Sequence, residues 1–257
     1  TAIHEQNAVL GRANRLLATR VDRIATCFEA IEGLPEAASD KVSVTGMPVR
    51  PSVISYQDAP YPEIADDKPF RLMVIGGSQG ARVLSDVVPA AIAGLPDVLR
   101  RRMHIVQQCR PEDLERVRAA YADAQVNAEL ASFFDDVPAR LAEAHLVIGR
   151  AGASMVAEVM MIGRPSLLIP YPYATDDHQT RNAHAVNEAG AGWLLPEPAF
   201  SVDQLRNRIE SLLGMPAVLE RTAINAKSLA RPQAAKALAD IVVDLIPNGA
   251  NGERRAA

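Results

Sequence analysis

The chain has 257 residues, a formal net charge of −4 at pH 7 and 48% apolar residues. This composition excludes a disordered chain, a collagen-like chain and a strongly basic nucleic-acid-binding protein, so no nucleic-acid partner is expected. No stretch reaches the roughly 20 apolar residues that a membrane-spanning helix needs, and any membrane contact is therefore expected to be peripheral.

The cysteines indicate the redox environment of the protein, and the first residues indicate how its sequence begins. Cys27 and Cys109 form neither a CxxC motif nor a Cys/His pattern, so the sequence predicts no disulfide framework, no zinc module and a reducing environment. The first seven residues lack an initiator Met and a signal-peptide pattern, and they are typical of the middle of a domain. We therefore expect a segment to be missing at the start.

Residues 1–50 have the pattern expected for the tail of an N-terminal α/β domain. Apolar residues recur at helical spacing over 8–18, and short strands are predicted at 23–28 and 42–45. Residues 51–69 hold four prolines and an acidic cluster without apolar periodicity, which predicts an interdomain linker.

Strands then alternate with helices between residues 70 and 230. Strands are predicted at 70–75, 104–107, 129–133, 146–148, 166–169 and 193–195, and helices at 79–93, 112–122, 137–144, 154–161 and 177–188. This alternation predicts a Rossmann-like, doubly wound parallel sheet that binds ligands at the carboxyl ends of its strands. Helices follow at 202–213, 217–229 and 233–246; residues 231–246 are expected to return to the first domain, and 247–257 to form a disordered tail.

The first strand-end loop is Gly76-Gly77-Ser78-Gln79-Gly80-Ala81. Its glycines allow positive φ, and the free N–H groups at the start of the next helix favour a phosphate. The absence of a following Lys and of GxGxxG spacing argues against a P-loop nucleotidase and a dinucleotide fold. Taken alone, the motif is equally consistent with a plain tight turn.

The second loop is Gly149-Arg150-Ala151-Gly152-Ala153-Ser154, after the strand at 146–148. Glu158 lies one helical turn after Ser154, where a carboxylate can accept hydrogen bonds from ribose hydroxyls. The alternative is that Glu158 only complements the dipole of its helix.

The third loop runs from Pro170 to Ala183. Two prolines stiffen it, Asp176 can cap the following helix, and Gln179 and Asn182 can present amides to a hydroxyl-rich ligand such as a sugar. The alternative is that its acidic pair forms only a cap and that His178 is an exposed helix residue. A metal site is not expected, because the nearest other histidine lies six positions further on a different face.

Five motifs, taken together and in order, resemble a known enzyme family. They are His4-Glu5-Gln6-Asn7, Gly46 to Arg50, Gly76 to Ala81, Arg150 through Glu158, and Asp177 to Ala183. In this order they are similar to the MurG family within glycosyltransferase family 28, which transfers N-acetylglucosamine in peptidoglycan synthesis. The resemblance covers almost the whole chain and implies an α/β fold of the GT-B type, with two Rossmann-like domains. The C-terminal, nucleotide-sugar-binding domain is expected to be complete at 70–230.

The resemblance also implies a donor site. Ser78 is expected to contact the diphosphate, the Phe134 backbone the uracil, Glu158 the ribose, and Gln179 with His178 the sugar hydroxyls. His178 stands where the family often has a second Gln, and Met47 replaces the Asn of its GNPVR segment. The expected donor-binding residues are Asn7, Arg50, Ser78, Gln79, Phe134, Ala153, Glu158, His178 and Gln179.

The implied reaction is inverting transfer of N-acetylglucosamine from UDP-N-acetylglucosamine to lipid I, giving lipid II and UDP without a cofactor or bound metal. The implied location is peripheral, at the cytoplasmic face of the bacterial inner membrane. The family's GGTGGH-like loop, which carries the suspected general base, does not occur here, so no catalytic residue is assigned and the fragment alone is expected to be inactive. The alternatives are a non-catalytic nucleotide-sugar-binding subunit that needs a partner, and a UDP-sugar epimerase of the same fold.

Overall fold

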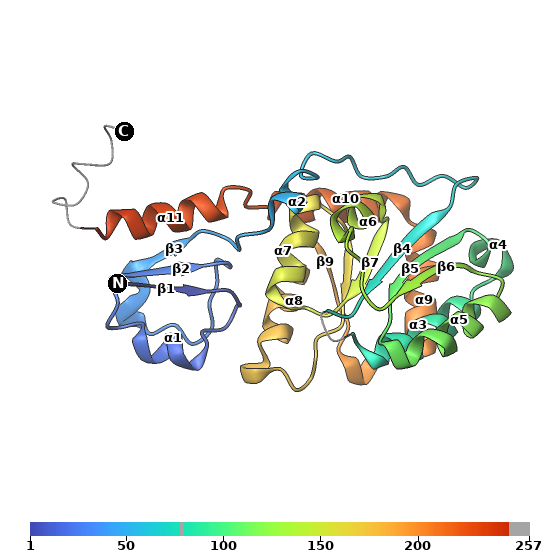
Figure 1. Cartoon of the computed structure of the whole chain (residues 1–257), viewed down its shortest axis with the longest axis horizontal. Helices are drawn as coiled ribbons and strands as arrows, with labels where there is room; N and C mark the ends of the chain where they lie inside the picture. Colours follow the sequence, from blue (N-terminus) through green and yellow to red (C-terminus); the bar gives the residue numbers. More distant parts are fainter. Residues whose placement is uncertain (78–79, 247–257) are drawn as a thin grey trace. The chain divides into compact units, whose positions relative to one another are not determined.

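The computed structural model describes residues 1–77 and 80–246, and the chain divides into two compact units. Unit 1 comprises residues 1–50 and 231–257, and unit 2 comprises residues 51–230. Each unit contains a parallel sheet flanked by helices, which confirms the predicted α/β fold class (Figure 1).

Unit 1 contains a three-stranded parallel sheet in the order β1-β2-β3. Its small core is formed by Leu10, Ala18, Val21, Ile24 and Ala38. The elements of this unit are β1 Ala2–Glu5, α1 Arg12–Leu17, β2 Arg23–Thr26, η1 Glu36–Lys41, β3 Val42–Val44 and α11 Ala234–Asp244.

Two features at the start of unit 1 differ from the sequence prediction. Strand β1 was not predicted, because its His4 and Glu5 interrupt the apolar pattern of a buried strand. The first helix starts only at Arg12, since the chain before it pairs with Glu32: the Leu10 N–H donates to the Glu32 carbonyl at 2.8 Å, and the Glu32 N–H donates to the Ala8 carbonyl at 2.9 Å.

Unit 2 contains a six-stranded parallel sheet in the order β6-β5-β4-β7-β8-β9. Its strands are β4 Phe70–Ile75, β5 Met103–Gln108, β6 Asn127–Ala131, β7 Leu146–Gly149, β8 Ser166–Leu168 and β9 Gly192–Leu194. Its helices are α2 Pro51–Ile54, α3 Arg82–Ala93, α4 Asp97–Arg100, η2 Pro111–Asp113, α5 Leu114–Asp123, α6 Val137–Glu143, α7 Ala153–Ile162, η3 Thr175–Asp177, α8 His178–Glu188, η4 Glu197–Ala199, α9 Val202–Leu213 and α10 Pro216–Ser228.

Local sequence explains several of these boundaries. Helix α9 begins at the predicted residue, because Ser201 accepts a hydrogen bond from the Gln204 N–H at 3.3 Å and so caps the helix. Helix α7 ends at Ile162, because the next residue, Gly163, has a φ of +77°, a left-handed conformation that glycine adopts without strain. Strand β6 lies two residues before its predicted position, since Ala128 and Leu130 are the residues that pack against the core.

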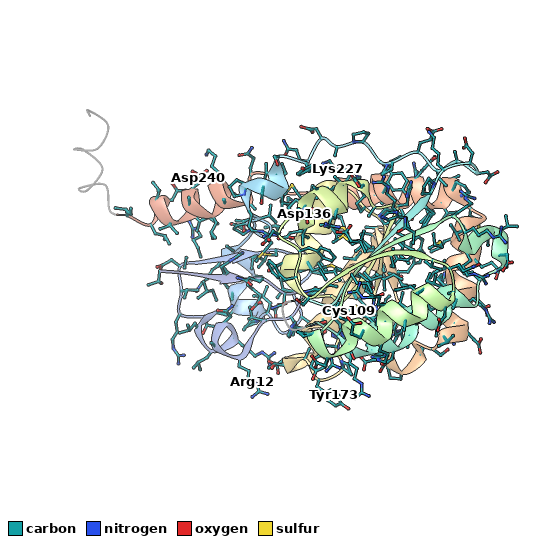
Figure 2. The ribbon with its side chains drawn as sticks, turned by 45° about the vertical axis from the view of Figure 1, so that its right-hand side comes forward. Arg12, Cys109, Asp136, Tyr173, Lys227 and Asp240 are labelled. Carbon is teal, nitrogen blue, oxygen red and sulfur yellow. The ribbon has the colours of Figure 1, made fainter. Side chains whose placement is uncertain are left out.

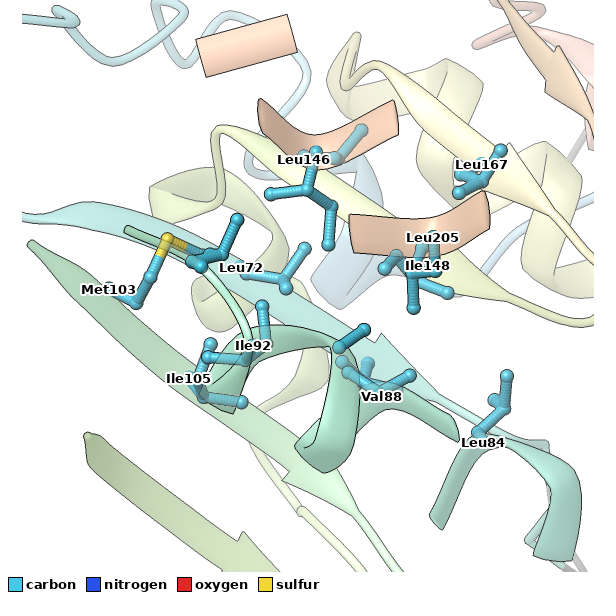
Figure 3. Packing of buried hydrophobic residues seen from close by; sticks show 14 of the residues in the cluster. Leu72, Leu84, Val88, Ile92, Met103, Ile105, Leu146, Ile148, Leu167 and Leu205 are labelled. Atoms are coloured by element: carbon cyan, nitrogen blue, oxygen red, sulfur yellow. The ribbon is translucent and has the colours of Figure 1, made fainter. Parts of the chain in front are cut away.

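The main core of unit 2 lies on one face of the sheet. Leu72, Ile105, Leu146 and Ile148 project from three neighbouring strands toward α3 and α9 (Figure 3). Successive residues of a strand point to opposite faces of the sheet. When helices cover both faces, most residues of both sets are buried. Helices α6 and α7 cover the opposite face, where Arg140 of α6 pairs with Glu129 of β6 at 2.7 Å.

Buried polar groups hold residues 60–63 against the rest of unit 2. Arg164 is 1% exposed and donates to the carbonyls of Pro60, Leu141 and Ala142 at 2.8, 3.0 and 2.6 Å. Burial lowers the pKa of its guanidinium to about 10. The Tyr61 hydroxyl donates to the His145 carbonyl at 2.7 Å, so the chain before β4 is ordered against the domain.

Candidate functional site

Three of the predicted loops begin side by side at the carboxyl edge of the unit 2 sheet. In the register of the strands, Ile75 is the neighbour of Gly149, and Gly149 is the neighbour of Leu168. The strand order also reverses between β4 and β7. In doubly wound folds, ligands bind at such a reversal, outside the carboxyl ends of the strands. Figure 2 labels Cys109, directly after β5, and Tyr173, in the loop after β8, at this edge.

At each glycine of the loop after β4 that the structure describes, either a positive φ or a close neighbour disfavours a side chain. Gly77 and Gly80 have φ of +84° and +69°, and the Gly80 N–H donates to the Gly77 carbonyl at 2.9 Å. A Cβ on Gly76 would lie 2.4 Å from the Ala81 nitrogen. Ala81, the N-cap of α3, gives no side-chain cap, so the first N–H groups of this helix are available to an anion. The predicted contacts Ser78 and Gln79 lie outside the described residues.

The loop after β7 is held by two amide side chains of α8. Gln179 Oε1 accepts a hydrogen bond from the Ala151 N–H at 3.2 Å, and Asn182 Nδ2 donates to the Ala151 carbonyl at 3.0 Å. Ala153 is the first residue of α7, which Gly152 precedes as an N-cap without a side-chain hydrogen bond. Glu158 lies half-buried in the second turn of this helix.

The loop after β8 is tied to the same glutamine. Gln179 Oε1 also accepts from the Tyr171 N–H at 3.0 Å, so one oxygen joins the loops after β7 and β8. The N-cap of α8 is Asp177, not the predicted Asp176, and it accepts from the Thr180 hydroxyl at 2.6 Å. The correction follows from the backbone, since Asp177, with a left-handed φ of +52°, directly precedes His178, the first residue of α8. His178 Nδ1 is 2.8 Å from the Thr175 carbonyl.

Arg150 has a supporting role that the sequence analysis did not assign. Its Nη1 donates to the carbonyls of Ile169 and Pro170 at 3.2 and 3.1 Å and lies 2.5 Å from Glu197 Oε2. Its guanidinium also lies over the Tyr171 ring, 5.3 Å from the centroid. Arg150 therefore joins the loop after β7 to the loop after β8 and to η4. The sequence feature that could have indicated this role is that Arg150 is the single basic residue in a loop of small residues.

Phe134 follows strand β6 in a loop on the side of the sheet that α6 covers. The residue is 7% exposed, and its ring centroid lies 4.2 Å from the central carbon of the Arg140 guanidinium. The hydrogen bonds of Arg140 to Glu129 and Asp136 raise the pKa of the guanidinium, so it keeps its charge. The side chain of Phe134 is thus anchored.

Asn7 and Arg50 belong to unit 1. Glu5 is 4% exposed and accepts from the Asn7 N–H, the Gly11 N–H and Asn14 Nδ2 at 3.0, 2.9 and 2.9 Å. This buried carboxylate fixes the loop that carries Asn7. Arg50 is exposed at the end of the unit's first segment.

One thiol of unit 1 lies close to a histidine. Cys27 Sγ is 3.3 Å from His4 Nε2. Burial raises the pKa of the Cys27 thiol to about 12 and lowers the pKa of His4, so the pair is not a thiolate nucleophile with a charged base.

The structure offers neither a metal site nor a membrane span in the part of the chain that it describes. Over residues 1–77 and 80–246, no group of three or more His, Cys, Asp or Glu side chains is placed to hold a metal ion. Among the described residues, no helix has both the length and the apolar character needed to cross a bilayer.

Comparisons with known proteins agree on one family. The model of the glycosyltransferase family 28 C-terminal domain matches residues 71–238. The chain is 57% identical over 248 residues to the UDP-N-acetylglucosamine--N-acetylmuramyl-(pentapeptide) pyrophosphoryl-undecaprenol N-acetylglucosamine transferase of Paramagnetospirillum magneticum, covering 96% of this chain and 67% of the relative. It is 50% identical over 242 residues to the enzyme of the same name from Rhodospirillum centenum, covering 94% and 64%.

A solved structure gives the same result. The crystal structure of Acinetobacter baumannii MurG matches with a TM-score of 0.80 and 29% identity over 95% of this chain and 67% of that one. The chain therefore spans about two thirds of the length of these relatives.

Proposed function

Because the chain belongs to glycosyltransferase family 28, as its five motifs predicted, we propose that the protein transfers N-acetylglucosamine from UDP-N-acetylglucosamine to lipid I. The products are lipid II and UDP, and the anomeric centre is inverted. The observation that carries the proposal is the meeting of three loops at one edge of the unit 2 sheet, with Gln179 bonded to two of them.

The proposed donor site uses each of these loops for a different part of the nucleotide sugar. The diphosphate lies at Gly76 to Ala81, where glycines and the uncapped start of α3 present N–H groups. The Phe134 backbone contacts uracil, and Glu158 accepts hydrogen bonds from the ribose hydroxyls. Gln179 and His178 contact the sugar. The further proposed contacts are Asn7, Arg50, Ser78, Gln79 and Ala153.

The proposed chemistry is a single displacement. The 4-hydroxyl of the muramyl residue attacks the anomeric carbon opposite the departing UDP, and its proton passes to a base that is not assigned here. N–H groups at the start of α3 stabilise the charge that builds on the diphosphate, and Arg50 adds a guanidinium. Positively polarised groups of this kind perform the work of a metal ion, so the proposal includes no cofactor.

The nature of the acceptor fixes the proposed location. Lipid I is embedded in a membrane by its undecaprenyl chain, so the protein works as a peripheral protein on the cytoplasmic face of the bacterial inner membrane. This step places the protein in peptidoglycan synthesis, on which cell shape and division depend.

Calorimetric titration of the chain with UDP-N-acetylglucosamine and UDP-glucose tests the donor site. We expect measurable binding of both nucleotide sugars and tighter binding of UDP-N-acetylglucosamine, since the proposed site reads the sugar as well as the nucleotide. Equal and negligible heats for the two ligands would contradict the proposal.

Turnover assays separate the proposed reaction from its alternatives. Because the fragment alone is expected to be inactive, these assays use the protein together with the N-terminal segment expected from its sequence; product analysis with donor and lipid I together should show lipid II and UDP. Epimerised sugar nucleotide formed from the donor alone would instead indicate an epimerase. Binding without turnover, converted to transfer by a second protein, would indicate a nucleotide-sugar-binding subunit.

A further inference from the structure

The loop after β4 packs against a residue that follows the neighbouring strand. Strands β4 and β5 are adjacent in the sheet, with Val74 opposite Gln107, so the loops that follow them leave the same edge side by side. Arg110 follows β5 and lies directly against Gly80: a Cβ on Gly80 would lie 2.7 Å from Arg110 Cγ and 3.4 Å from the Arg110 nitrogen. The φ of Gly80 is +69°, so this glycine supplies both a left-handed backbone and the room that Arg110 occupies.

A buried carboxylate holds the guanidinium of Arg110 in place. Arg110 Nε donates to Asp113 Oδ2 at 2.7 Å, and the Asp113 side chain is 6% exposed. This hydrogen bond lowers the pKa of Asp113, so the carboxylate is charged at neutral pH. The stem of Arg110 therefore keeps its position against Gly80, since leaving it would break a charge-assisted hydrogen bond to a buried group.

The same carboxylate is also connected to the helix that follows the loop. Its second oxygen, Oδ1, accepts from Arg116 Nη2 at 2.7 Å. Arg116 Nη2 also lies 2.7 Å from Asp86 Oδ1, and Arg116 Nη1 donates to the Ser85 carbonyl at 3.2 Å. Ser85 and Asp86 lie near the start of α3. Asp113 thus connects the loop with the helix whose first N–H groups bind the diphosphate in the proposed site.

We propose that Arg110 and Asp113 are positioning residues for the diphosphate: they hold Gly80 against the start of α3, so that the main-chain N–H groups there are fixed before the donor binds. This inference rests on the proposed donor site and adds residues that act through the loop. Donors fixed in advance need no ordering on binding, so they bind an anion more tightly than the same donors on a loose loop.

Calorimetry with UDP, and with uridine measured by displacement of UDP, tests the inference. Arg110→Ala removes both the stem against Gly80 and the hydrogen bond to Asp113. UDP should bind about tenfold more weakly to this variant, whereas the affinity for uridine, which carries no phosphate, should stay within about twofold of the wild type. An equal loss for UDP and uridine, or no loss for UDP, would overturn the inference.

A second variant separates positioning from simple charge. Asp113→Asn keeps the shape of the side chain but removes a negative charge near the proposed diphosphate. Relief of repulsion alone would make UDP bind more tightly, whereas a weakened hold on Arg110 makes UDP bind more weakly. We expect a loss of about threefold or more. UDP binding as tight as in the wild type, or tighter, would overturn the inference even if Arg110→Ala does not fold.

Arg118→Ala is the matched control. Arg118 is an exposed arginine of α5 that lies 3.6 Å from Glu115, so its replacement removes one positive charge, as Arg110→Ala does. The affinities for UDP and uridine should not change. A loss of UDP affinity as large as in Arg110→Ala would overturn the inference, because net charge would then account for it. If the wild type binds UDP no more tightly than uridine, the proposed diphosphate site itself fails and the inference with it, an outcome distinct from tight UDP binding that does not depend on Arg110.

Discussion

Gln179 and Asn182, three residues apart on α8, bind the two main-chain polar groups of Ala151 at 3.2 and 3.0 Å. The loop after β7 is therefore positioned by side chains that the sequence suggested for ligand contact. The Gln179 oxygen is already engaged by two N–H groups, so its Nε2 is the group that remains for a sugar hydroxyl.

The first prediction separates the role of the Gln179 amide oxygen from that of its NH₂ group. Gln179→Glu keeps an oxygen that can accept from the Ala151 and Tyr171 N–H groups, but it removes the NH₂ donor. Both Gln179→Glu and Gln179→Ala should lose the preference for UDP-N-acetylglucosamine over UDP. Only Gln179→Ala should also lose stability, by about 1 kcal/mol, because it leaves the Ala151 and Tyr171 N–H groups without their acceptor.

Thermal unfolding and calorimetry on the two variants check this. Gln204→Ala, on the exposed side of α9, serves as the control and should change neither quantity. Equal unfolding temperatures for Gln179→Ala and Gln179→Glu would show that the oxygen does not position the loops.

A second prediction separates the two interpretations of Glu158. If its carboxylate holds the ribose, Glu158→Gln should weaken UDP and UDP-N-acetylglucosamine by the same factor, about tenfold. The factor is shared because both ligands carry the same ribose. The 2′,3′-dideoxy analogue of UDP should bind the variant and the wild type alike. If Glu158 only complements the helix dipole, unfolding temperature falls and the Kd values stay as they are.

The sequence predicted the strand-end loops better than the contacts between them. Apolar periodicity located the strands of unit 2, and parallel strands end at a common edge, so the loops at Gly76, Gly149 and Pro170 could be placed together. Periodicity carries no information on hydrogen bonds over long separations, such as Gln179 to Ala151 or Arg150 to Glu197. For that reason the supporting role of Arg150 emerged only from the structure.

Strand β1 shows a second limit of the same reasoning. Its Glu5 is buried because donors from the following loop surround the carboxylate, not because the residue is apolar. A pattern of hydrophobic residues cannot reveal burial that hydrogen bonds make possible.

A third prediction concerns Gly149, where β7 meets its loop. A Cβ at this position would lie 2.3 Å from Met155 Cε and 2.7 Å from the Ile75 carbonyl oxygen. Gly149→Ala should therefore destabilise the fold by about 1–3 kcal/mol, since the Ile75 backbone cannot move without disturbing β4. Gly152→Ala is the matched control, because a Cβ there would meet nothing within 4 Å and the residue's φ is −66°. Urea unfolding of both variants should show a lower midpoint for Gly149→Ala.

The last prediction concerns His145, which is 4% exposed and stacks on Phe70 with ring centroids 5.0 Å apart. Its Nδ1 accepts from the Arg71 N–H at 2.9 Å, so the neutral ring is the one that fits. Burial lowers the pKa of His145 below its ordinary value of 6.5. The unfolded chain therefore takes up a proton near pH 6.5, whereas the folded chain resists it until the pH is lower.

The stability that the neutral ring contributes is thus complete above pH 6.5 and is lost as the pH falls toward the folded-state pKa. The free energy of unfolding, measured by urea titration between pH 8 and pH 5, should decline across this window. His145→Asn keeps an acceptor for Arg71 and cannot titrate, so it should be less stable at pH 8 but show a shallower decline. The exposed His184→Asn variant should retain the wild-type slope. An unchanged slope in His145→Asn would assign the pH dependence to other groups, because the buried ring would then take up no fewer protons than the unfolded chain.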